Sequence, residues 1–370
     1  MIEIPFLKPN VVKNEAYLPY LDQIDISRVY SNYGPLNDLF EQRVLLEYFN
    51  NEGAVSTVNN ATTGLILAIS ACKRKGGKYA LMPSFTFSAT PLAAIWAGLE
   101  PYFIDISEDN WCMNENIVKE VIEKLGDDVA VVVPYATFGT WLDLSYYMSL
   151  MNQGIPVVVD AAASFGTCLD KQFGTAFDGA IVFSFHATKA FGIGEGGLVY
   201  SSDQNLIKRI REAANFGFNG DRESCLLGLN GKTSEYTAAI ALATLPEFPE
   251  KKKVRNKIRE WYLDTMKSSH LQERGWRIQE TKGSIAHQFF PILCPKDQVN
   301  SDLVKRLETQ GIQVRHYFSP ACHEQEMFRS YPRSNLSVTD EIQKRILSLP
   351  LWEEMDENHV IRVVRSLVNG

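Results

Sequence analysis

The sequence has few of the features that define small secreted, metal-bound or membrane proteins. Its 370 residues include only six cysteines, which are widely spaced and form no CxxC pair. That spacing argues against a disulfide framework and against a zinc site, so we expect reduced thiols and no metal. No apolar run approaches the about 20 residues that cross a bilayer. Segment 1–5 lacks the basic start and apolar stretch of a signal peptide. We therefore expect a cytoplasmic protein with no membrane association.

The chain also lacks an excess of positive charge. It has 37 Lys and Arg against 44 Asp and Glu, which gives a net charge of −7. The main basic run, 251–253, leads into a helix-like segment with acidic neighbours, so we interpret it as a solvated helix face. We expect no nucleic-acid partner. There are no internal repeats or low-complexity segments, and the length suggests about two domains.

What the sequence does contain, from about residue 40 to 200, is an alternation of short apolar runs and helix-like stretches. Two of the expected helices are 62–72 and 91–98, and the expected strands are 79–82, 101–106, 129–133, 155–159, 180–185 and 197–201. Short, β-branched, fully apolar strands separated by helices predict a mainly parallel sheet covered on both faces. Ligands of such folds bind beyond the carboxyl ends of the strands.

The pattern changes after Thr233. A long helical region reaches about residue 267 with an interruption near Pro246 and Pro249, and a strand candidate follows at 287–293. A helix is expected at 301–310, before a loop-rich stretch. We predict a large domain over residues 1–250, beginning with an arm of about thirty residues, and a small C-terminal α+β domain over residues 251–370.

One lysine lies in a segment suited to catalysis. Segment 183–189 is an expected strand that runs into a polar loop ending at Lys189, and the glycine-rich segment 192–197 then leads into the next strand. A lysine desolvated over a cleft has a lowered pKa and becomes a nucleophile. The glycines could equally form a simple hairpin turn. They do not fit a dinucleotide-binding fingerprint, because no helix follows them.

A carboxylate, Asp160, ends the apolar run 156–159. An acid at the tip of a buried strand is unfavourable unless it is paired. It could cap the next helix, or it could be the counter-ion of a cationic ring nitrogen. At about 4 Å in a partly shielded site, that pair has a gross attraction on the order of 4 kcal/mol. Such a partner would keep a pyridinium protonated, as carbanion chemistry requires.

Two further segments could contribute to a binding site. Segment 60–64 places Thr62 and Thr63 at the start of an apolar helix, where hydroxyls and backbone N–H groups suit a phosphate. Ordinary helix capping is the alternative. Phe87 follows an expected strand and could stack on a planar ring, although an aromatic residue there could also belong to the core.

Together these segments follow one another in an order that resembles fold-type-I aminotransferases, and specifically the DegT/StrS family of sugar-nucleotide aminotransferases. The resemblance covers nearly the whole chain and rests on segments 4–6, 34–35, 40–41, 83–87, 138–139, 160–162, 184–189, 194–197, 230, 234–235 and 347–350. It implies a large α/β domain with a mainly parallel, seven-stranded sheet between helices, a small C-terminal domain, and the cofactor pyridoxal 5′-phosphate (PLP).

The resemblance also implies roles for individual residues. Lys189 would hold PLP as a Schiff base and move the proton during catalysis, Asp160 would pair with the pyridine nitrogen, and Phe87 would lie against the ring. The phosphate would be bound by Thr62, Thr63 and Ser184. Asn230 matches an asparagine that reaches the phosphate of the neighbouring subunit, which implies a homodimer. Tyr33 and His323 are candidates for contacting the substrate.

Two positions depart from the family pattern. The family usually has glutamine three residues after the strand-tip acid, where this chain has Ala163, so a hydrogen bond to the cofactor's phenolic oxygen must come from elsewhere or be absent. Many members have histidine where this chain has Ala136. Neither change affects the lysine, the acid or the phosphate loop, so we expect a reshaped pocket in an active enzyme.

The expected reaction transfers the amino group of L-glutamate to a nucleotide-linked keto sugar. Segments 31–35 and 160–163 resemble the branch that converts dTDP-4-keto-6-deoxyhexoses to 4-amino-4,6-dideoxyhexoses, which serve surface polysaccharides such as lipopolysaccharide. A 3-keto sugar aminotransferase of the same family and a non-catalytic PLP-binding sensor are the alternatives. A related dehydratase group has histidine in place of the lysine, so Lys189 argues against that activity.

Overall fold

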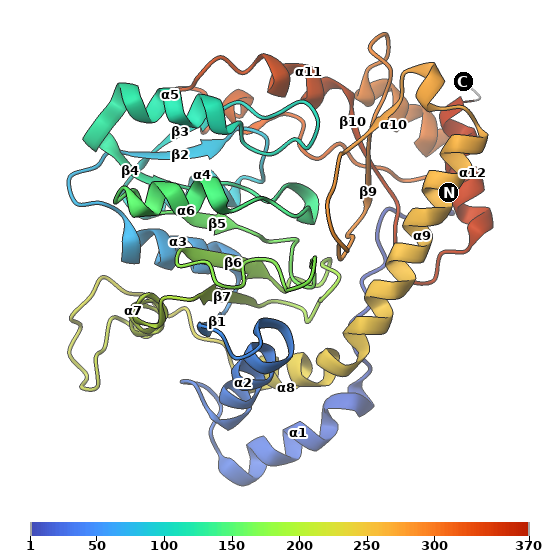
Figure 1. Cartoon of the computed structure of the whole chain (residues 1–370). Helices are drawn as coiled ribbons and strands as arrows, with labels where there is room; N and C mark the ends of the chain where they lie inside the picture. The colour runs from blue at the N-terminus through green and yellow to red at the C-terminus, as the bar shows by residue number, and fades with distance from the viewer. Residues whose placement is uncertain (1, 369–370) are drawn as a thin grey trace.

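The structure is a computed structural model that describes residues 2–368, and seven of its strands form one twisted sheet (Figure 1). Their order is β3-β2-β4-β5-β6-β7-β1, since parallel bridges at Val132–Val157 and Tyr135–Asp160 join the two hydrogen-bonded groups of strands. Of these seven strands, β7 runs in the direction opposite to the other six. The predicted mainly parallel sheet is confirmed. The strands are β1 (Ala54–Val58), β2 (Tyr79–Pro83), β3 (Glu100–Ile104), β4 (Val129–Val132), β5 (Val158–Asp160), β6 (Ala180–Ser184) and β7 (Gly197–Ser201).

Helices pack on both faces of this sheet because its strands are apolar on both sides. Neighbouring strand residues such as Leu81 and Met82 enter two different buried clusters, as a period of two requires. One cluster includes α3 (Ala61–Cys72), α4 (Ala89–Trp96) and α7 (Gln204–Ala214). The other includes α2 (Pro35–Phe49), α5 (Glu115–Leu125), α6 (Ser145–Asn152) and α8 (Glu235–Thr244). Short 3-10 helices lie at η1 (Gly126–Asp128) and η2 (Thr137–Gly139).

The start of α3 is held close to the sheet. The Asn60 side chain accepts a hydrogen bond from the Thr63 N–H (2.9 Å) and so begins the helix. A Cβ atom at Gly64 would lie 2.9 Å from the Val182 side chain of β6. Glycine therefore lets the first turn of α3 approach the carboxyl ends of the central strands.

The C-terminal part of the chain forms a second, smaller unit with its own core. Its sheet has the order β10-β9-β8, and the long helix α9 (Phe248–Ser268) connects it to α8 (Figure 1). The elements are β8 (Arg277–Ile278), β9 (Phe290–Leu293), β10 (Ile346–Leu349), α10 (Asn300–Thr309), α11 (Ser337–Arg345), α12 (Glu357–Val368), η3 (Leu245–Glu247), η4 (Gln272–Arg274) and η5 (Cys322–Glu324). The proposed domain boundary at 250/251 falls inside α9 and stays a prediction.

Several elements were not anticipated from the sequence. Part of the N-terminal arm, Asn14–Ser27, is the helix α1, and Ile4 bridges to Ile312 of the C-terminal unit. Strand β1 was missed because its Ser and Thr residues interrupt the apolar pattern. The strand expected at 287–293 begins only at Phe290. Between residues 2 and 368, no helix combines the length and the apolar character that crossing a membrane requires.

A buried glutamate links the N-terminal segment to α8. The carboxylate of Glu235 accepts hydrogen bonds from the backbone N–H groups of Leu36 (2.7 Å) and Asn37 (3.0 Å) at the start of α2. A Cβ atom at Gly34 would lie 2.7 Å from Glu235 Cδ, so glycine is needed for this approach. The acid satisfies donors that the helix itself cannot pair.

We predict that Glu235→Ala lowers the free energy of unfolding by about 2 kcal/mol, because it leaves two buried N–H groups without an acceptor. Urea unfolding followed by circular dichroism measures the change. The control is Glu223→Ala in an exposed loop, which should change stability by less than about 0.5 kcal/mol. Equal losses in the two variants would contradict the capping role.

Candidate active site

A cavity of about 690 Å³ lies where the carboxyl ends of β5 and β6 meet the start of α3 and segments of the C-terminal unit. This is the edge at which ligands bind in open parallel sheets. Six residues singled out in the sequence line the cavity, namely Thr62, Thr63, Phe87, Asp160, Ser184 and Lys189, and His186 lines it with them. The structure therefore brings together residues from four separate segments of the chain, 62–63, 87, 160 and 184–189.

Lys189 and Asp160 share this cavity, and each has a defined partner. The Lys189 Nζ donates to Gln288 Oε1 (3.1 Å). The Asp160 carboxylate accepts hydrogen bonds from the hydroxyl of Thr90 (2.6 Å) and the backbone N–H of Ala162 (3.1 Å). The backbone of Asp160 is fixed between strands, because its N–H donates to Pro134 and its carbonyl accepts from Ala136. The acid is thus held rigidly, with its carboxylate in the cavity.

Burial opposes the charge on both groups. Desolvation lowers the pKa of Lys189 to about 8, although the attraction of Asp160 acts in the opposite direction. Desolvation likewise raises the pKa of Asp160, against the hydrogen bonds from Thr90 and Ala162 and the attraction of Lys189. About a tenth of Lys189 is therefore a neutral, nucleophilic amine at pH 7, far more than for a lysine of ordinary pKa.

The candidate phosphate residues surround the start of α3. Thr62 and Thr63 are half-buried on its first turn, and Ser184 ends β6 with little exposure. The first N–H groups of a helix have no partner within the helix and attract anions. The Asn60 side chain takes the Thr63 N–H, which leaves the neighbouring donors and hydroxyls on the cavity wall.

Aromatic side chains form one wall of the cavity. Phe87 is 60% exposed and lies at its mouth, 6.4 Å between ring centroids from Phe318. Phe138 packs against Phe318 and Phe289, at centroid distances of 5.6 and 5.1 Å. This wall offers flat apolar surface to a planar ligand.

Asn230 and Tyr33 do not line this cavity. Asn230 is exposed, and its side-chain oxygen accepts a hydrogen bond from Lys232 Nζ (2.8 Å). The Tyr33 hydroxyl donates to the Arg211 carbonyl (3.3 Å), and the Arg211 guanidinium lies 3.8 Å from the centre of the Tyr33 ring. Arg211 in turn pairs with Glu41, so Tyr33 belongs to a polar network beneath α2.

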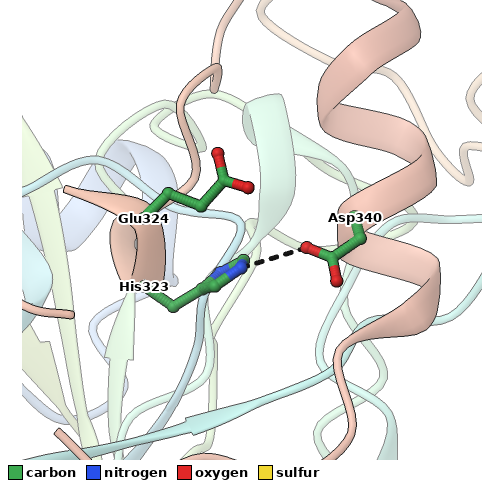
Figure 2. A group of neighbouring side chains, drawn as sticks. All are labelled: His323, Glu324 and Asp340. Carbon is green, nitrogen blue, oxygen red and sulfur yellow. Dashed lines mark ion pairs between the residues drawn. The ribbon is translucent and has the colours of Figure 1, made fainter. Parts of the chain in front are cut away.

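His323 also lies outside the cavity, in a surface hollow with Glu324 and Asp340 (Figure 2). Its Nδ1 bonds to the Ser84 hydroxyl (2.7 Å), and its Nε2 faces Asp340 Oδ1 (3.0 Å). Both ring nitrogens are therefore engaged, and the hollow also contains the cationic side chains of Arg329, Arg333 and Lys344. The contacts tie η5 to α11 and to the residue that follows β2, and the substrate contact expected of His323 stays a prediction.

Two polar residues of the site were missed from the sequence. Thr90 is the second residue of α4, and its hydroxyl donates to Asp160 and lies 2.9 Å from that of Thr86. Gln288 lies within the strand expected at 287–293, and its side chain enters the cavity. Neither residue lies in a recognisable motif, so only its position in space reveals its contact.

Comparison with known proteins agrees with this geometry. Residues 12–368 match the model of the DegT/DnrJ/EryC1/StrS aminotransferase family. The chain belongs to this family. Its cofactor is PLP, as the family indicates.

Two solved structures and one curated relative illustrate the similarity. A Bacillus cereus protein provisionally named a PLP-dependent aminotransferase is 51% identical, with a TM-score of 0.98 over 99% of this chain and 100% of that one. DesI, solved in the presence of its TDP-sugar product, is 32% identical, with a TM-score of 0.88 over 99% and 92%. The dTDP-4-amino-4,6-dideoxy-D-glucose transaminase of Escherichia coli is 26% identical over 99% of this chain and 98% of its own.

The residues of this aminotransferase fit the cofactor. The cavity combines an amine of lowered pKa, a rigid carboxylate, an anion-attracting helix start and an aromatic wall. These match, in turn, the aldehyde, the ring nitrogen, the phosphate and the flat ring of PLP. Position 163 is a buried alanine, which has no polar side chain to offer the cofactor.

We predict that Lys189 of the cofactor-free protein reacts with an acylating reagent with a midpoint near pH 8, whereas an ordinary lysine has a pKa of about 10.4. Pulse labelling across pH, followed by peptide mass spectrometry, measures the midpoint. Asp160→Asn removes the attraction that favours the ammonium form, so it should move the midpoint to lower pH. A wild-type midpoint close to that of ordinary lysines would contradict the pKa assignment.

Proposed function

We propose that the protein transfers the amino group of L-glutamate to a nucleotide-linked keto sugar, a dTDP-4-keto-6-deoxyhexose that becomes a 4-amino-4,6-dideoxyhexose. The observation that carries the proposal is the shared cavity of Lys189 and Asp160. The similarity to DesI and to the E. coli transaminase supports the substrate class. The product would serve surface polysaccharide synthesis, as in lipopolysaccharide.

In the proposed mechanism, Lys189 attaches the cofactor through its neutral amine. Once it is free, the same amine would act first as a general base, which takes a proton from the amino-donor carbon. It would then act as a general acid, which gives the proton to the carbon of the cofactor. The bound cofactor would supply the electron sink that removal of this proton requires. A pKa of about 8 suits both roles, since the amine changes protonation state near neutral pH.

Asp160 would pair with the protonated ring nitrogen. Its carboxylate is kept in place by Thr90 and Ala162, which donate hydrogen bonds to it. Thr62, Thr63 and Ser184 would hold the phosphate at the start of α3, and Phe87 would cover one ring face. The remaining cavity, between this end and the aromatic wall, would accept the sugar.

The central test is spectroscopic. The purified protein should show a visible absorbance band that bleaches with L-glutamate and returns with the 4-keto sugar nucleotide. Lys189→Ala should abolish the band, and Asp160→Ala should reduce turnover a hundredfold or more, since the pair is worth on the order of 4 kcal/mol in gross attraction. Return of the band only with a 3-keto sugar nucleotide would favour that alternative. Persistence of the band under glutamate would favour a non-catalytic sensor.

A homodimer is part of the proposal, with Asn230 binding the phosphate in the partner's site. The exposure of Asn230 in a single chain supports this role. We predict that Lys189→Ala and Asn230→Asp chains, each inactive alone, regain activity when co-expressed, because one site of the mixed dimer receives both intact residues. Activity of purified, doubly tagged heterodimers measures the rescue. If Asn230 acted within its own chain, every site would keep one defect and no activity would return.

A further inference from the structure

Gln288 connects the lysine to a chain of polar side chains along the cavity. Its Oε1 accepts from Lys189 Nζ (3.1 Å), and its Nε2 donates to the Thr188 hydroxyl (3.2 Å). Thr188 Oγ1 lies 2.8 Å from His186 Nδ1, and His186 Nε2 lies 3.7 Å from Glu195. All five residues line the cavity.

One backbone contact fixes a consistent set of directions for the hydrogen bonds that join His186, Thr188, Gln288 and Lys189. The backbone N–H of Thr188 also approaches His186 Nδ1 (3.3 Å), and an N–H can only donate, so Nδ1 is an acceptor. The Thr188 hydroxyl therefore donates its proton to Nδ1, and its oxygen accepts from the Gln288 amide. The amide carbonyl must then face Lys189. The opposite orientation would place the amide N–H groups against the ammonium form of Lys189, where two donors would face each other.

Contacts outside this row of hydrogen-bonded side chains fix the backbone next to Gln288. Arg255 of α9 donates from Nη1 to the carbonyl of His287 (2.8 Å). Arg255 is only 3% exposed and forms an ion pair with Glu353 (2.8 Å). The C-terminal unit therefore holds the Gln288 backbone rigidly, and the side-chain amide oxygen reaches Lys189 from this support. An accurate positioning contact requires such a support.

We propose that Gln288 is a positioning residue that holds the free amine of Lys189 and favours its ammonium form. The inference rests on the proposed role of Lys189. A carbonyl that accepts from an amine stabilises the charged form more than the neutral one. It also directs the amine toward the C-terminal unit whenever the lysine is not attached to the cofactor. The other titratable side chains that line the same cavity are Asp160, Glu195, His186, Tyr135 and Tyr317, and the variants below leave all of them in place.

The test is the pH dependence of cofactor capture by the cofactor-free full-length protein. The rate at which the visible band grows after mixing with PLP follows the neutral fraction of Lys189. Gln288→Leu should move the midpoint to lower pH by about 0.5 to 1 pH unit, because the lost hydrogen bond stabilises the charged amine more than the neutral one. Gln288→Glu should move it to higher pH, because a carboxylate then faces the amine. Thr188→Val, which frees the amide to rotate, should give a smaller shift in the same direction as Gln288→Leu.

Opposite shifts in the Leu and Glu variants support the proposal, because a residue that only supports the fold would not move the midpoint in both directions. The control is Gln153→Leu, an exposed glutamine at the end of α6, which should keep the wild-type profile. Unchanged midpoints in both Gln288 variants overturn the proposal. The assay uses no amino donor or sugar, so failure to aminate a keto sugar would contradict the proposed function and leave these profiles unaffected.

Discussion

The chemistry of the site depends on the burial of an amine, Lys189, and a carboxylate, Asp160, in one cavity. Desolvation acts against the charge of each, so the lysine becomes a better nucleophile and the acid needs its hydrogen bonds. A lysine pKa lowered from 10.5 to about 8 corresponds to at most about 3 kcal/mol of lost stability. The unfolded lysine binds its proton more tightly, so this cost is complete below pH 8 and disappears as the pH rises toward 10.5. The rest of the protein provides the stability that such a site lacks.

The central sheet provides both the stability and the placement. Its strands are buried on two faces, so their carboxyl ends are fixed relative to one another. Asp160 at the end of β5 and Ser184 at the end of β6 are neighbours because those strands pair in parallel. Gly64 permits α3 to lie against β6, which brings its first turn to the same edge. The positions of the charged and anion-binding groups therefore follow from strand order.

This dependence explains which parts could be predicted from the sequence. The parallel sheet was predictable because its strands are short, apolar and separated by helices, and most of the cavity residues directly follow a strand or begin a helix. Gln288 could not be found in this way, because it meets Lys189 from 99 residues away and its own segment resembles a strand. Thr90 reaches Asp160 because of the way α4 is rotated about its axis, which the sequence does not reveal.

The side chains of Tyr33 and His323 suit a substrate contact chemically, but both lie outside the cavity. Tyr33 bonds to Arg211, and His323 bonds to Ser84 and pairs with Asp340. The role of Asn230 depends on a second chain and stays a prediction.

The two units of the chain divide the work of the site. The sheet carries the amine, the acid and the anion-binding turn, whereas Phe289, Tyr317 and Phe318 of the C-terminal unit complete the wall that a substrate would meet. Arg255 and Glu353 anchor that unit near Gln288 without touching the sheet's polar groups. Side chains on the wall can therefore change size and shape without disturbing the pair on the sheet. Under the proposed function, such an arrangement would let one chemical mechanism serve different sugars, because much of the aromatic wall comes from a different part of the chain than Lys189 and Asp160.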